Sequence, residues 1–476
     1  MLYAKQRDGT RMKKEWKSVL KAGEEQKEQS ATIHVGDCLT VLKKMKDESF
    51  DACFCDPPYG MNFMGKRWDH GVPSAKVWKE VYRVLKPGGF LLAFGGTRTF
   101  HRLATAIEDA GFEIRDTCCW LYGSGFPKSA DISKQLDKKA GKNRTKVVGR
   151  YKPPDMKGEW NLRNAKDKRT VDLFSSSRNN LEIFEPATEE AKLWNGYGTA
   201  LKPAYEPIVV AMKPTDGTFA ENALKYGVAG LNIDGSRISA SKDDVAAARV
   251  PQPKLNSPTG KIYGFKTGVG RNGDEFDMSR GRFPANILLD EEAARLLDQQ
   301  SGVSTNKGHF PKSRFKEKSG YAWNMSIKVG TPEKLMNDTG GASRFFYVAK
   351  ASRSERNAGL DGMKKRESGL YDDDSYRGQG ERKADHTTAK PRANHHPTVK
   401  PITLNKYLAK MVLPPQNGRR RKLLVPFSGS GSEMIGALRV GWDKVVGIEK
   451  EADYVDIAEK RIKHWNGCKL EIYDWE

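Results

Sequence analysis

Two short segments, one near each end of the chain, have the composition of a reaction site. The first, Asp56-Pro57-Pro58-Tyr59, follows the apolar run 50–55. Two prolines after an acid fix a rigid, extended turn, so the Asp56 carboxylate and the Pro57 carbonyl can present adjacent acceptors, with Tyr59 as a flat stacking surface. This set suits a planar ring with an exocyclic amine, such as a nucleobase, whose nitrogen lone pair must be localised before it attacks an electrophile. An ordinary proline turn after a buried strand is the alternative.

The second segment is a glycine-rich turn, Phe427-Ser428-Gly429-Ser430-Gly431-Ser432, between a predicted strand and a predicted helix. The missing side chains let a ligand approach the backbone, and the first helical turn offers free N–H groups. Glu449 stands 18 residues after Gly431, at the end of the next predicted strand. A carboxylate at that position can hold both hydroxyls of a ribose. The two features together indicate a cofactor that contains a nucleoside.

The elements that position these segments alternate between strand and helix. Strands are predicted at 32–35, 50–55, 90–94, 112–121, 208–212, 423–426 and 445–449, and helices at 38–45, 77–85, 99–110, 291–299, 433–440 and 454–465. The run 86–89, Lys-Pro-Gly-Gly, is predicted to end a helix. This alternation is typical of an α/β fold with a doubly wound, mostly parallel sheet, on which ligands bind at the carboxyl ends of the strands.

The composition points to a polyanionic partner. The chain has 82 Lys and Arg against 60 Asp and Glu, a net charge of +22, which favours nucleic acid, although a solvated basic surface is the simpler explanation. Its 476 residues allow about three domains, or one core with large insertions. Basic residues gather between 128 and 190, which predicts a basic insertion in the core.

Several classes of protein are not expected. No apolar run is long enough to span a membrane, and the first residues lack the apolar region of a signal peptide, so we expect a cytoplasmic protein. The six cysteines show no Cys-x-x-Cys spacing and resemble small core residues. His395 and His396 have no acidic or thiol partner at ligand spacing, and no metal is expected.

The two segments together resemble the β class of amino-methylating DNA methyltransferases, including phage and prophage members. In that class the catalytic tetrapeptide comes first, a target-recognition region follows, and the cofactor loop comes last. The run 396–401, His-Pro-Thr-Val-Lys-Pro, is similar to the family's helix-leading cofactor motif, and Gly36-Asp37 to its acidic contact with the cofactor's adenine. The resemblance implies an α/β methyltransferase fold, the cofactor S-adenosylmethionine without metal, and a flipped adenine in double-stranded DNA that is methylated at N6.

The resemblance also implies roles for individual residues and divides the chain. The expected catalytic residues are Asp56, Pro57, Pro58 and Tyr59, and the expected cofactor-binding residues are Asp37, Thr398, Lys400, Pro401, Phe427, Ser428, Gly429, Ser430, Gly431, Ser432 and Glu449. DNA phosphates are expected at Lys128, Lys138, Lys139, Arg144, Lys312 and Arg314. The expected divisions are an arm (1–30), a catalytic half (31–130), a basic insertion (131–195), a returning core strand (196–215), a target-recognition region (216–392) and a cofactor half (393–476).

One departure and several alternatives stay open. The family usually has an acid two residues before the phenylalanine of its cofactor loop, where this chain has Val425. N4 of cytosine is an alternative acceptor, since it displays the same amine chemistry, although Asp-Pro-Pro-Tyr accompanies adenine more often in this family. An RNA methyltransferase and a DNA-binding protein that no longer methylates are further alternatives. A homodimer and a separate restriction nuclease remain open as partners.

Overall fold

The structure is a computed structural model. It describes residues 28–61, 69–123, 125, 129–150, 182–240, 261–262, 265–266, 280–307, 337–350, 354–365 and 393–475. Internal contacts divide the chain into two compact units. The larger is formed by Met1–Gly123 together with Tyr205–Glu476, and the smaller by Ser124–Ala204.

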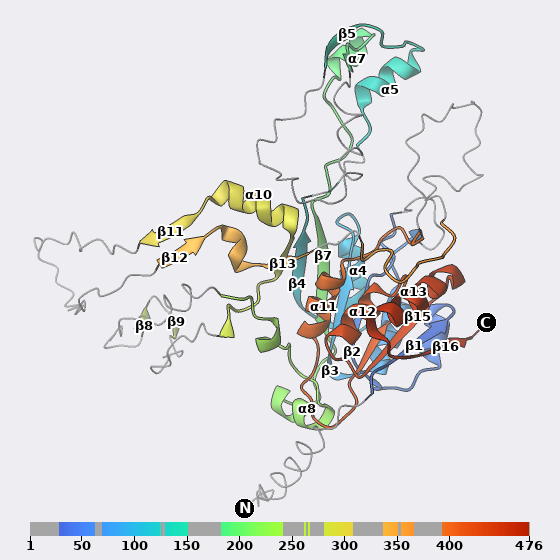
Figure 1. Ribbon diagram of the computed structural model, residues 1–476, viewed down its shortest axis with the longest axis vertical. Helices are drawn as coiled ribbons and strands as arrows, with labels where there is room; N and C mark the ends of the chain where they lie inside the picture. The colour runs from blue at the N-terminus through green and yellow to red at the C-terminus, as the bar shows by residue number, and fades with distance from the viewer. Residues whose placement is uncertain are drawn as a thin grey trace, which may run out of the picture. The chain divides into compact units, whose positions relative to one another are not determined.

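The larger unit is built on a ten-stranded sheet with the strand order β13-β10-β4-β7-β3-β2-β14-β15-β1-β16 (Figure 1). Its strands are β1 (Ser30–Val35), β2 (Phe50–Cys55), β3 (Leu85–Phe94), β4 (Glu113–Leu121), β7 (Tyr205–Met212), β10 (Ile287–Asp290), β13 (Tyr347–Ala349), β14 (Lys422–Val425), β15 (Lys444–Glu449) and β16 (Lys469–Asp474). Every neighbouring pair is parallel except the two that β7 makes, with β3 and with β4. The predicted α/β fold with a mostly parallel sheet is confirmed.

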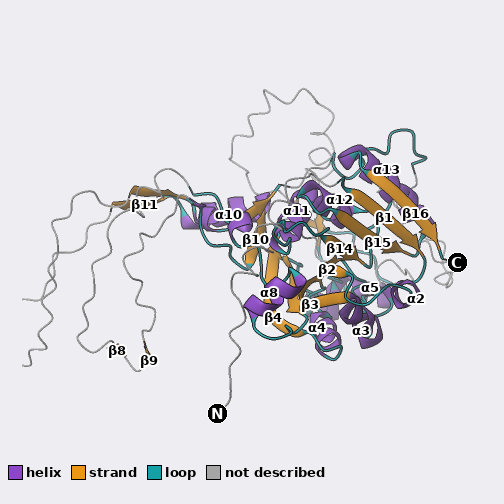
Figure 2. Ribbon diagram, turned by 90° about the horizontal axis from the view of Figure 1, so that it is seen from below, coloured by secondary structure: helices purple, strands orange, loops and turns teal. Residues whose placement is uncertain are grey.

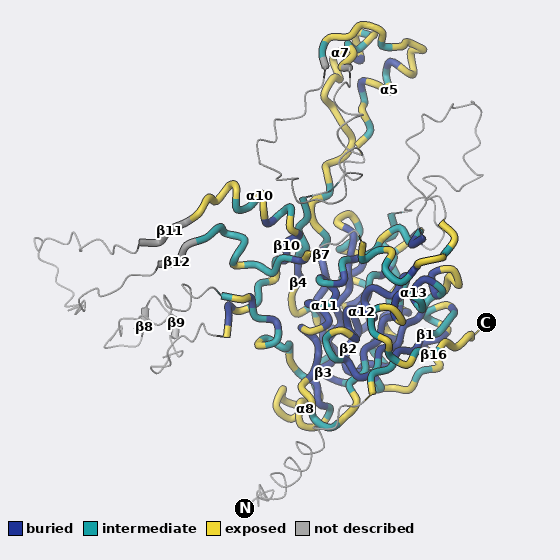
Figure 3. The backbone as a smooth tube through the Cα atoms, viewed as in Figure 1, coloured by how far each residue is buried: buried dark blue, intermediate teal, exposed yellow. Residues whose placement is uncertain are grey.

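Helices cover both faces of this sheet, as Figure 2 shows. The helices α2 (Cys38–Lys43), α3 (Ala75–Val84) and α4 (Phe100–Glu108) share one hydrophobic core with the sheet. The helices α11 (Ile402–Met411), α12 (Ser432–Arg439) and α13 (Ala452–Asn466) share the core on the other face. Figure 3 shows the buried residues of this unit concentrated in the sheet and these helices. Helices can pack on both faces because successive residues of a strand point to opposite faces, and each buried strand has apolar side chains on both.

The prediction that residues 86–89 only end a helix is wrong in part. The helix α3 does end at Val84, but β3 begins at once with Leu85 and passes through both glycines. A Cβ atom on Gly89 would lie 2.9 Å from the Asp51 carbonyl oxygen, and one on Gly88 would lie 2.3 Å from Asn222 Nδ2. The glycines therefore permit close packing inside a strand and do not act only as a stop signal.

The region predicted for target recognition, 216–392, also contributes to the sheet. Both β10 and β13 fall within it, and β10 pairs in parallel with β4 and with β13. The other described elements in this range are α8 (Phe219–Tyr226), α10 (Glu291–Ser301), the 3-10 turns η5 (Asp234–Ser236) and η7 (Ala342–Phe345), and the short strands β8 (Lys261–Ile262), β9 (Phe265–Lys266), β11 (Ser304–Lys307) and β12 (Asn337–Gly340).

The smaller unit contains the segment that was predicted as a basic insertion. Its elements are α5 (Ile132–Lys139), α7 (Glu189–Leu193) and the antiparallel pair β5 (Val147–Arg150) and β6 (Glu182–Phe184). Asp137 organises it, because its carboxylate accepts hydrogen bonds from the backbone N–H groups of Ala187 and Thr188 and from Arg144 Nε at 2.6 Å. The unit is thus held together largely by polar contacts.

Candidate active site

The pairing of β2 with β14 brings the two chemical segments together. The two strands run in parallel, with Leu423 beside Ala52 and Leu424 beside Cys53. Continuing this register by three residues places Asp56 level with Phe427 at the carboxyl edge of the sheet. Parallel strands lie about 4.8 Å apart, so the tetrapeptide and the glycine-rich turn begin side by side. These two segments, far apart in the sequence, therefore adjoin at this edge of the sheet.

The glycine-rich turn is a compact loop that only glycine can build at two positions. Gly429 has φ +47° and Gly431 has φ +78°, which other residues rarely adopt. A Cβ atom on Gly429 would lie 2.8 Å from His396 Nε2, so the imidazole closes over the loop. Gly431 N–H donates to the Ser428 carbonyl at 2.7 Å, and Ser428 N–H donates to the Ile448 carbonyl at 2.9 Å. The loop is therefore fixed before any ligand arrives.

The serine hydroxyls of this loop serve its structure. The fully buried Arg461, on α13, donates from Nη1 to the Ser430 carbonyl, the Ser430 hydroxyl and the Ser432 hydroxyl, at 2.5, 2.9 and 3.0 Å. The Ser428 hydroxyl donates to the Ile448 carbonyl at 3.3 Å. These side chains were expected at the cofactor, but their hydroxyls are engaged inside the protein. The backbone of the loop is what it can offer to a ligand, and sequence reasoning missed Arg461.

Glu449 and Asp37 lie at the same edge of the sheet, Glu449 at the end of β15 and Asp37 two residues after the end of the neighbouring strand β1. Val35 pairs with Glu449, and Gly36 N–H donates to the Glu449 carbonyl at 2.9 Å. The Glu449 carboxylate accepts Gly429 N–H at 2.7 Å, which ties it to the loop, and burial raises its pKa. The exposed Asp37 carboxylate caps α2 by accepting Leu39 N–H at 3.1 Å. The arrangement fits a ribose beside the loop.

We define the amine pocket by four side chains: Asp56, Tyr59, Glu206 and Lys400. Lys400 Nζ lies 2.6 Å from Asp56 Oδ2, 3.2 Å from Glu206 Oε2 and 3.1 Å from the Tyr59 hydroxyl. The Tyr59 hydroxyl lies 2.8 Å from Asp56 Oδ1 and 2.9 Å from Glu206 Oε2, and it donates to one of them at a time. The pocket is closely packed and strongly charged.

Lys400 was expected at the cofactor, but the structure places it against Asp56. Its side chain is 5% exposed and its ammonium lies 4.7 Å from the centre of the Phe94 ring. The other members of its motif stay near the glycine-rich turn or lead into α11. The Thr398 carbonyl lies 2.9 Å from His396 Nδ1, and Pro401 directly precedes the helix. Burial lowers the pKa of His396 to about 3, so this imidazole is neutral.

Tyr59 points its hydroxyl into the amine pocket. The Tyr59 carbonyl accepts the Thr99 hydroxyl at 2.6 Å, which fixes the turn, and burial raises the pKa of the phenol well above its usual value. Of the two prolines, Pro57 is buried and Pro58 is partly buried. Phe427 packs edge-on against Trp78, with ring centres 6.2 Å apart. The stacking role expected for Tyr59 stays a prediction.

Glu433 is a buried acid in the first turn of α12 that sequence reasoning overlooked. It is 4% exposed, and its hydrogen bond from Asn405 Nδ2 is long, at 3.4 Å. Burial, with a smaller contribution from the nearby Asp56 carboxylate, raises the pKa of Glu433 to about 7. Val425, which stands where the family has an acid, is fully buried in the apolar core. The glycine-rich turn is therefore followed by a carboxyl group, Glu433 of α12, whereas the residue that precedes it at the end of β14, Val425, is apolar.

Replacing Glu433 with glutamine should stabilise the protein above neutral pH. In the folded protein the Glu433 carboxyl keeps its proton to about pH 7, whereas in the unfolded chain it loses its proton near pH 4.5. The free energy of unfolding of the wild type therefore falls as the pH rises from 4.5 to 7. We expect equal free energies of unfolding near pH 4 and a gain of about 1–3 kcal/mol for Glu433→Gln at pH 8. Urea unfolding at both pH values measures this. A gain that is the same at pH 4 and pH 8 would contradict it.

The residues expected to bind DNA phosphates differ in their surroundings. Lys138 and Lys139 are exposed in the last turn of α5 and stay candidates. Arg144 is less accessible, because its guanidinium pairs with Asp137 and donates to the Ser133 hydroxyl at 2.6 Å, with 14% of the side chain exposed. Its role at DNA stays a prediction. Lys128, Lys312 and Arg314 lie outside the described residues.

The described residues include neither a metal-binding cluster nor a membrane-spanning helix. No group of three or more His, Cys, Asp or Glu side chains in the described ranges is arranged to hold a metal ion. Within the same ranges, every helix is too short or too polar to cross a membrane.

Comparison with known proteins gives the chain relatives among the DNA methyltransferases. It is 26% identical over 269 residues to the type II methyltransferase M2.LlaDCHI of Lactococcus lactis subsp. cremoris, which covers 50% of this chain and 93% of that protein. It is 29% identical over 260 residues to the type II methyltransferase M.HinfI of Haemophilus influenzae, which covers 47% of this chain and 69% of that protein.

Solved structures of DNA methylases are also matched, at low similarity. The putative DNA modification methylase TTHA0409 of Thermus thermophilus, complexed with S-adenosylmethionine, is 13% identical, with a TM-score of 0.34 over 94% of this chain and 99% of that chain. The cytosine-N4-specific PvuII DNA methyltransferase is 12% identical, with a TM-score of 0.37 over 94% and 98%.

A family profile decides the assignment. The profile of the N6/N4 methyltransferases, described as DNA methylase, matches residues 50–460. This range includes the tetrapeptide, the glycine-rich turn and Glu449, and it is most of the chain. The chain therefore belongs to the N6/N4 DNA methylase family.

Proposed function

We propose that the protein transfers a methyl group from S-adenosylmethionine to the exocyclic N6 of an adenine that is flipped out of double-stranded DNA. The observation that supports this most is the parallel pairing of β2 with β14, which sets Asp56 level with the glycine-rich turn. Acceptor and donor sites at neighbouring strand ends allow the amine and the methyl group to meet in line. The membership of the DNA methylase family supports a DNA substrate.

The cofactor site fits a ligand with a nucleoside and a cationic sulfur. Glu449 would hold the ribose hydroxyls, and the backbone of residues 427–431 would follow the ligand closely because Gly429 and Gly431 lack side chains. The bound cofactor supplies an electrophilic methyl group on a positively charged sulfur. Glu433 and Asp56 are two buried carboxyl groups that interact electrostatically with each other, and each would attract a cation in its ionised form. No metal is required for this chemistry.

In the amine pocket, Asp56 and the Pro57 carbonyl accept the two hydrogens of the amine. This pushes the nitrogen toward tetrahedral geometry and stabilises the positive charge that forms on it as the new C–N bond is made and the methyl–sulfur bond breaks. The methylated amine then becomes neutral by releasing one proton to water. Tyr59 supplies a flat ring beside the base, which requires its hydroxyl to leave the contact with Asp56. Flipping the base costs a few kcal/mol, which contacts between basic side chains and DNA phosphates offset.

Adenine is preferred over cytosine because the tetrapeptide begins with aspartate, which in this family accompanies adenine more often than serine does. Incubating the protein with duplex DNA and labelled cofactor, then separating the nucleosides by mass spectrometry, tests this choice. We expect label in N6-methyladenine. Label in N4-methylcytosine would move the acceptor to the second candidate, and greater incorporation into structured RNA than into duplex DNA would overturn the DNA substrate.

A further inference from the structure

The amine pocket contains two side chains, Lys400 and Glu206, that the reaction as proposed does not use. They reach it from separate elements: Lys400 precedes α11, and Glu206 is the second residue of β7, the antiparallel strand. Lys400 Nζ has three oxygen partners within 3.2 Å, and Glu206 accepts from both Lys400 and Tyr59. Both side chains are largely buried, since Lys400 is 5% exposed and Glu206 is 21% exposed.

The charges in the pocket sum to a single negative charge when both carboxylates are ionised. Without Lys400, two carboxylates would lie close together in a buried site, and one of them would take up a proton. Without Glu206, Asp56 and Lys400 would form a neutral pair with less attraction for a cation. The arrangement therefore matches the charge that forms on an amine as it is methylated, because the amine becomes cationic before it loses a proton.

We propose that Lys400 and Glu206 are positioning residues of the amine site: Lys400 keeps Asp56 ionised and oriented, and Glu206 fixes Lys400 and leaves one negative charge for the cation that forms on the amine. This deepens the proposed function and rests on it. It also removes Lys400 from the set of cofactor ligands.

The electrostatics of Asp56 agree with this assignment. Burial raises its pKa, the Lys400 ammonium opposes that rise, and the Glu206 carboxylate adds to it. The two neighbours thus act in opposite directions on the same carboxyl group. The other titratable groups that face the pocket are Cys55 of β2, Glu433 of α12, Tyr122 after β4, and His396 before α11.

Three variants test the proposal through the pH dependence of methyl transfer in a single turnover. Lys400→Met should shift the acidic limb of the profile to higher pH, and Glu206→Gln should shift it to lower pH. Lys400→Arg should restore most of the wild-type profile because it restores the charge. We expect the rate at pH 7 to fall on the order of 10–100-fold for Lys400→Met. Glu113→Gln, an exposed glutamate on β4 of the same unit, is the matched control.

The affinity for S-adenosylmethionine and the titration of Asp56 complete the test. Calorimetry should give the same Kd for Lys400→Met as for wild type, whereas a tenfold loss with an unchanged pH profile would return Lys400 to the cofactor site. Shifts in the same direction for both variants, or none, would overturn the proposal. Following the Asp56 carboxyl by ¹³C NMR in the empty protein shows the same opposite shifts independently of turnover. Failure of methyl transfer alone would therefore count against the proposed function only.

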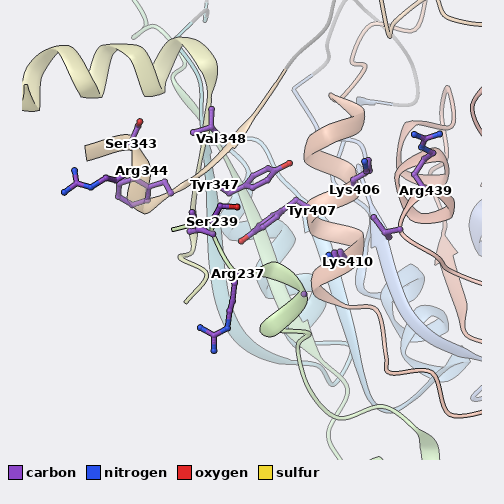
Figure 4. Close-up of a pocket in the computed structure, with 14 residues that line it drawn as sticks. Arg237, Ser239, Ser343, Arg344, Tyr347, Val348, Lys406, Tyr407, Lys410 and Arg439 are labelled. Carbon is purple, nitrogen blue, oxygen red and sulfur yellow. The ribbon is translucent and has the colours of Figure 1, made fainter. Parts of the chain in front are cut away.

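A second inference rests on a different part of the larger unit. An open groove of about 740 Å³ lies between α11, the end of α12, and the segments 235–239 and 343–348 (Figure 4). We name it the basic groove, because five cationic side chains line it and no acidic side chain does among the described residues. Those cations are Arg237, Arg344, Lys406, Lys410 and Arg439.

A stacked pair of tyrosines lines the basic groove and connects its walls. Tyr347 of β13 and Tyr407 of α11 stack with ring centres 3.9 Å apart, as the close-up shows. The Tyr407 hydroxyl donates to the Ser236 carbonyl at 3.0 Å, and the Tyr347 hydroxyl donates to the Thr403 carbonyl at 2.9 Å. These contacts join the segments around the groove, so its cations are held in place together.

The geometry points to the basic groove as a contact for the DNA backbone beside the target base. Lys410 is exposed and Lys406 is partly exposed, and Lys406 interacts electrostatically with Glu355. Both ammonium groups can therefore reach phosphates. The helix α11 that presents them begins two residues after Lys400. At 1.5 Å per residue, Lys406 lies about 6 Å and Lys410 about 12 Å along the helix axis from Ile402, the first residue of α11. That span covers a few phosphates of a duplex.

Reversing two charges in the basic groove tests this inference. The double variant Lys406→Glu/Lys410→Glu should weaken binding to duplex DNA at least tenfold at low salt, and should reduce the slope of log affinity against log salt by about 2. Lys76→Glu/Lys79→Glu makes the same charge change on exposed positions of α3, on the other face of the sheet. An equal loss of DNA affinity in both double variants would overturn the inference, and so would an unchanged salt slope for Lys406→Glu/Lys410→Glu. Neither result would count against the proposed methyl transfer to DNA.

Discussion

Replacing Asp56 with alanine is expected to lower methyl transfer on the order of 10²–10³-fold, because it removes the acceptor that stabilises the developing charge on the amine. Asp56→Asn should also lose most activity, since an amide is neutral and Lys400 would lose its counter-ion at 2.6 Å. Both effects should appear in the single-turnover rate. The affinity for duplex DNA, measured by fluorescence anisotropy, should change little, because Asp56 is 11% exposed and its carboxylate would repel phosphates rather than bind them.

Asp109→Asn provides the control for this prediction, as Asp109 is an exposed aspartate at the end of α4. It should leave the rate unchanged. A wild-type protein that binds DNA tightly but transfers no methyl group would support the alternative of a non-catalytic DNA-binding protein. Retention of full activity by Asp56→Ala would remove the tetrapeptide from the mechanism.

The second large effect is expected at Glu449. Replacing it with alanine should raise the Kd for S-adenosylmethionine about 10–100-fold, which corresponds to the loss of charge-assisted hydrogen bonds to the ribose. It should also loosen the glycine-rich turn, because Gly429 N–H would lose its acceptor at 2.7 Å. Glu449→Gln keeps an oxygen for that N–H and should show a smaller loss. Calorimetry on the purified protein measures both.

The neighbouring Glu451 is the control for Glu449. It is exposed, and its variant Glu451→Gln should bind the cofactor as wild type does. A loss of the same size at Glu451 would show that general negative charge, rather than the position at the end of β15, determines the affinity. An unchanged Kd for Glu449→Ala would contradict the assignment of the ribose site.

The parts of the site that follow strands could be predicted from the sequence, because local pattern identifies a strand and its last residue. Asp56 and Glu449 each end an apolar run, and carboxyl ends of parallel strands share one edge. The hydrophobic pattern does not indicate which strand lies beside which in the sheet. The adjacency of β2 and β14 and the pairing of β1 with β16 were seen only in the structure.

The side chains that hold the site together could not be predicted, since each acts at long range in the sequence. Glu206 accepts a hydrogen bond from Tyr59, which is 147 residues away in the sequence. Arg461 donates one to Ser430, which is 31 residues away. Lys400 belongs to a recognisable motif, but that motif indicates a cofactor role because it precedes the cofactor loop. The reach of this lysine across to Asp56 depends on how α11 packs on the sheet. The motif thus indicates that Lys400 is a functional residue, but it does not identify Asp56 as its partner.

The most direct measurement is a crystal structure of the protein with S-adenosylhomocysteine and a duplex that contains its target sequence. The account predicts that the cofactor product lies along residues 427–431 with its ribose at Glu449, and that an extruded adenine lies in the amine pocket with N6 within hydrogen-bond distance of Asp56. An adenine bound away from Asp56, or a cofactor bound away from the glycine-rich turn, would contradict it.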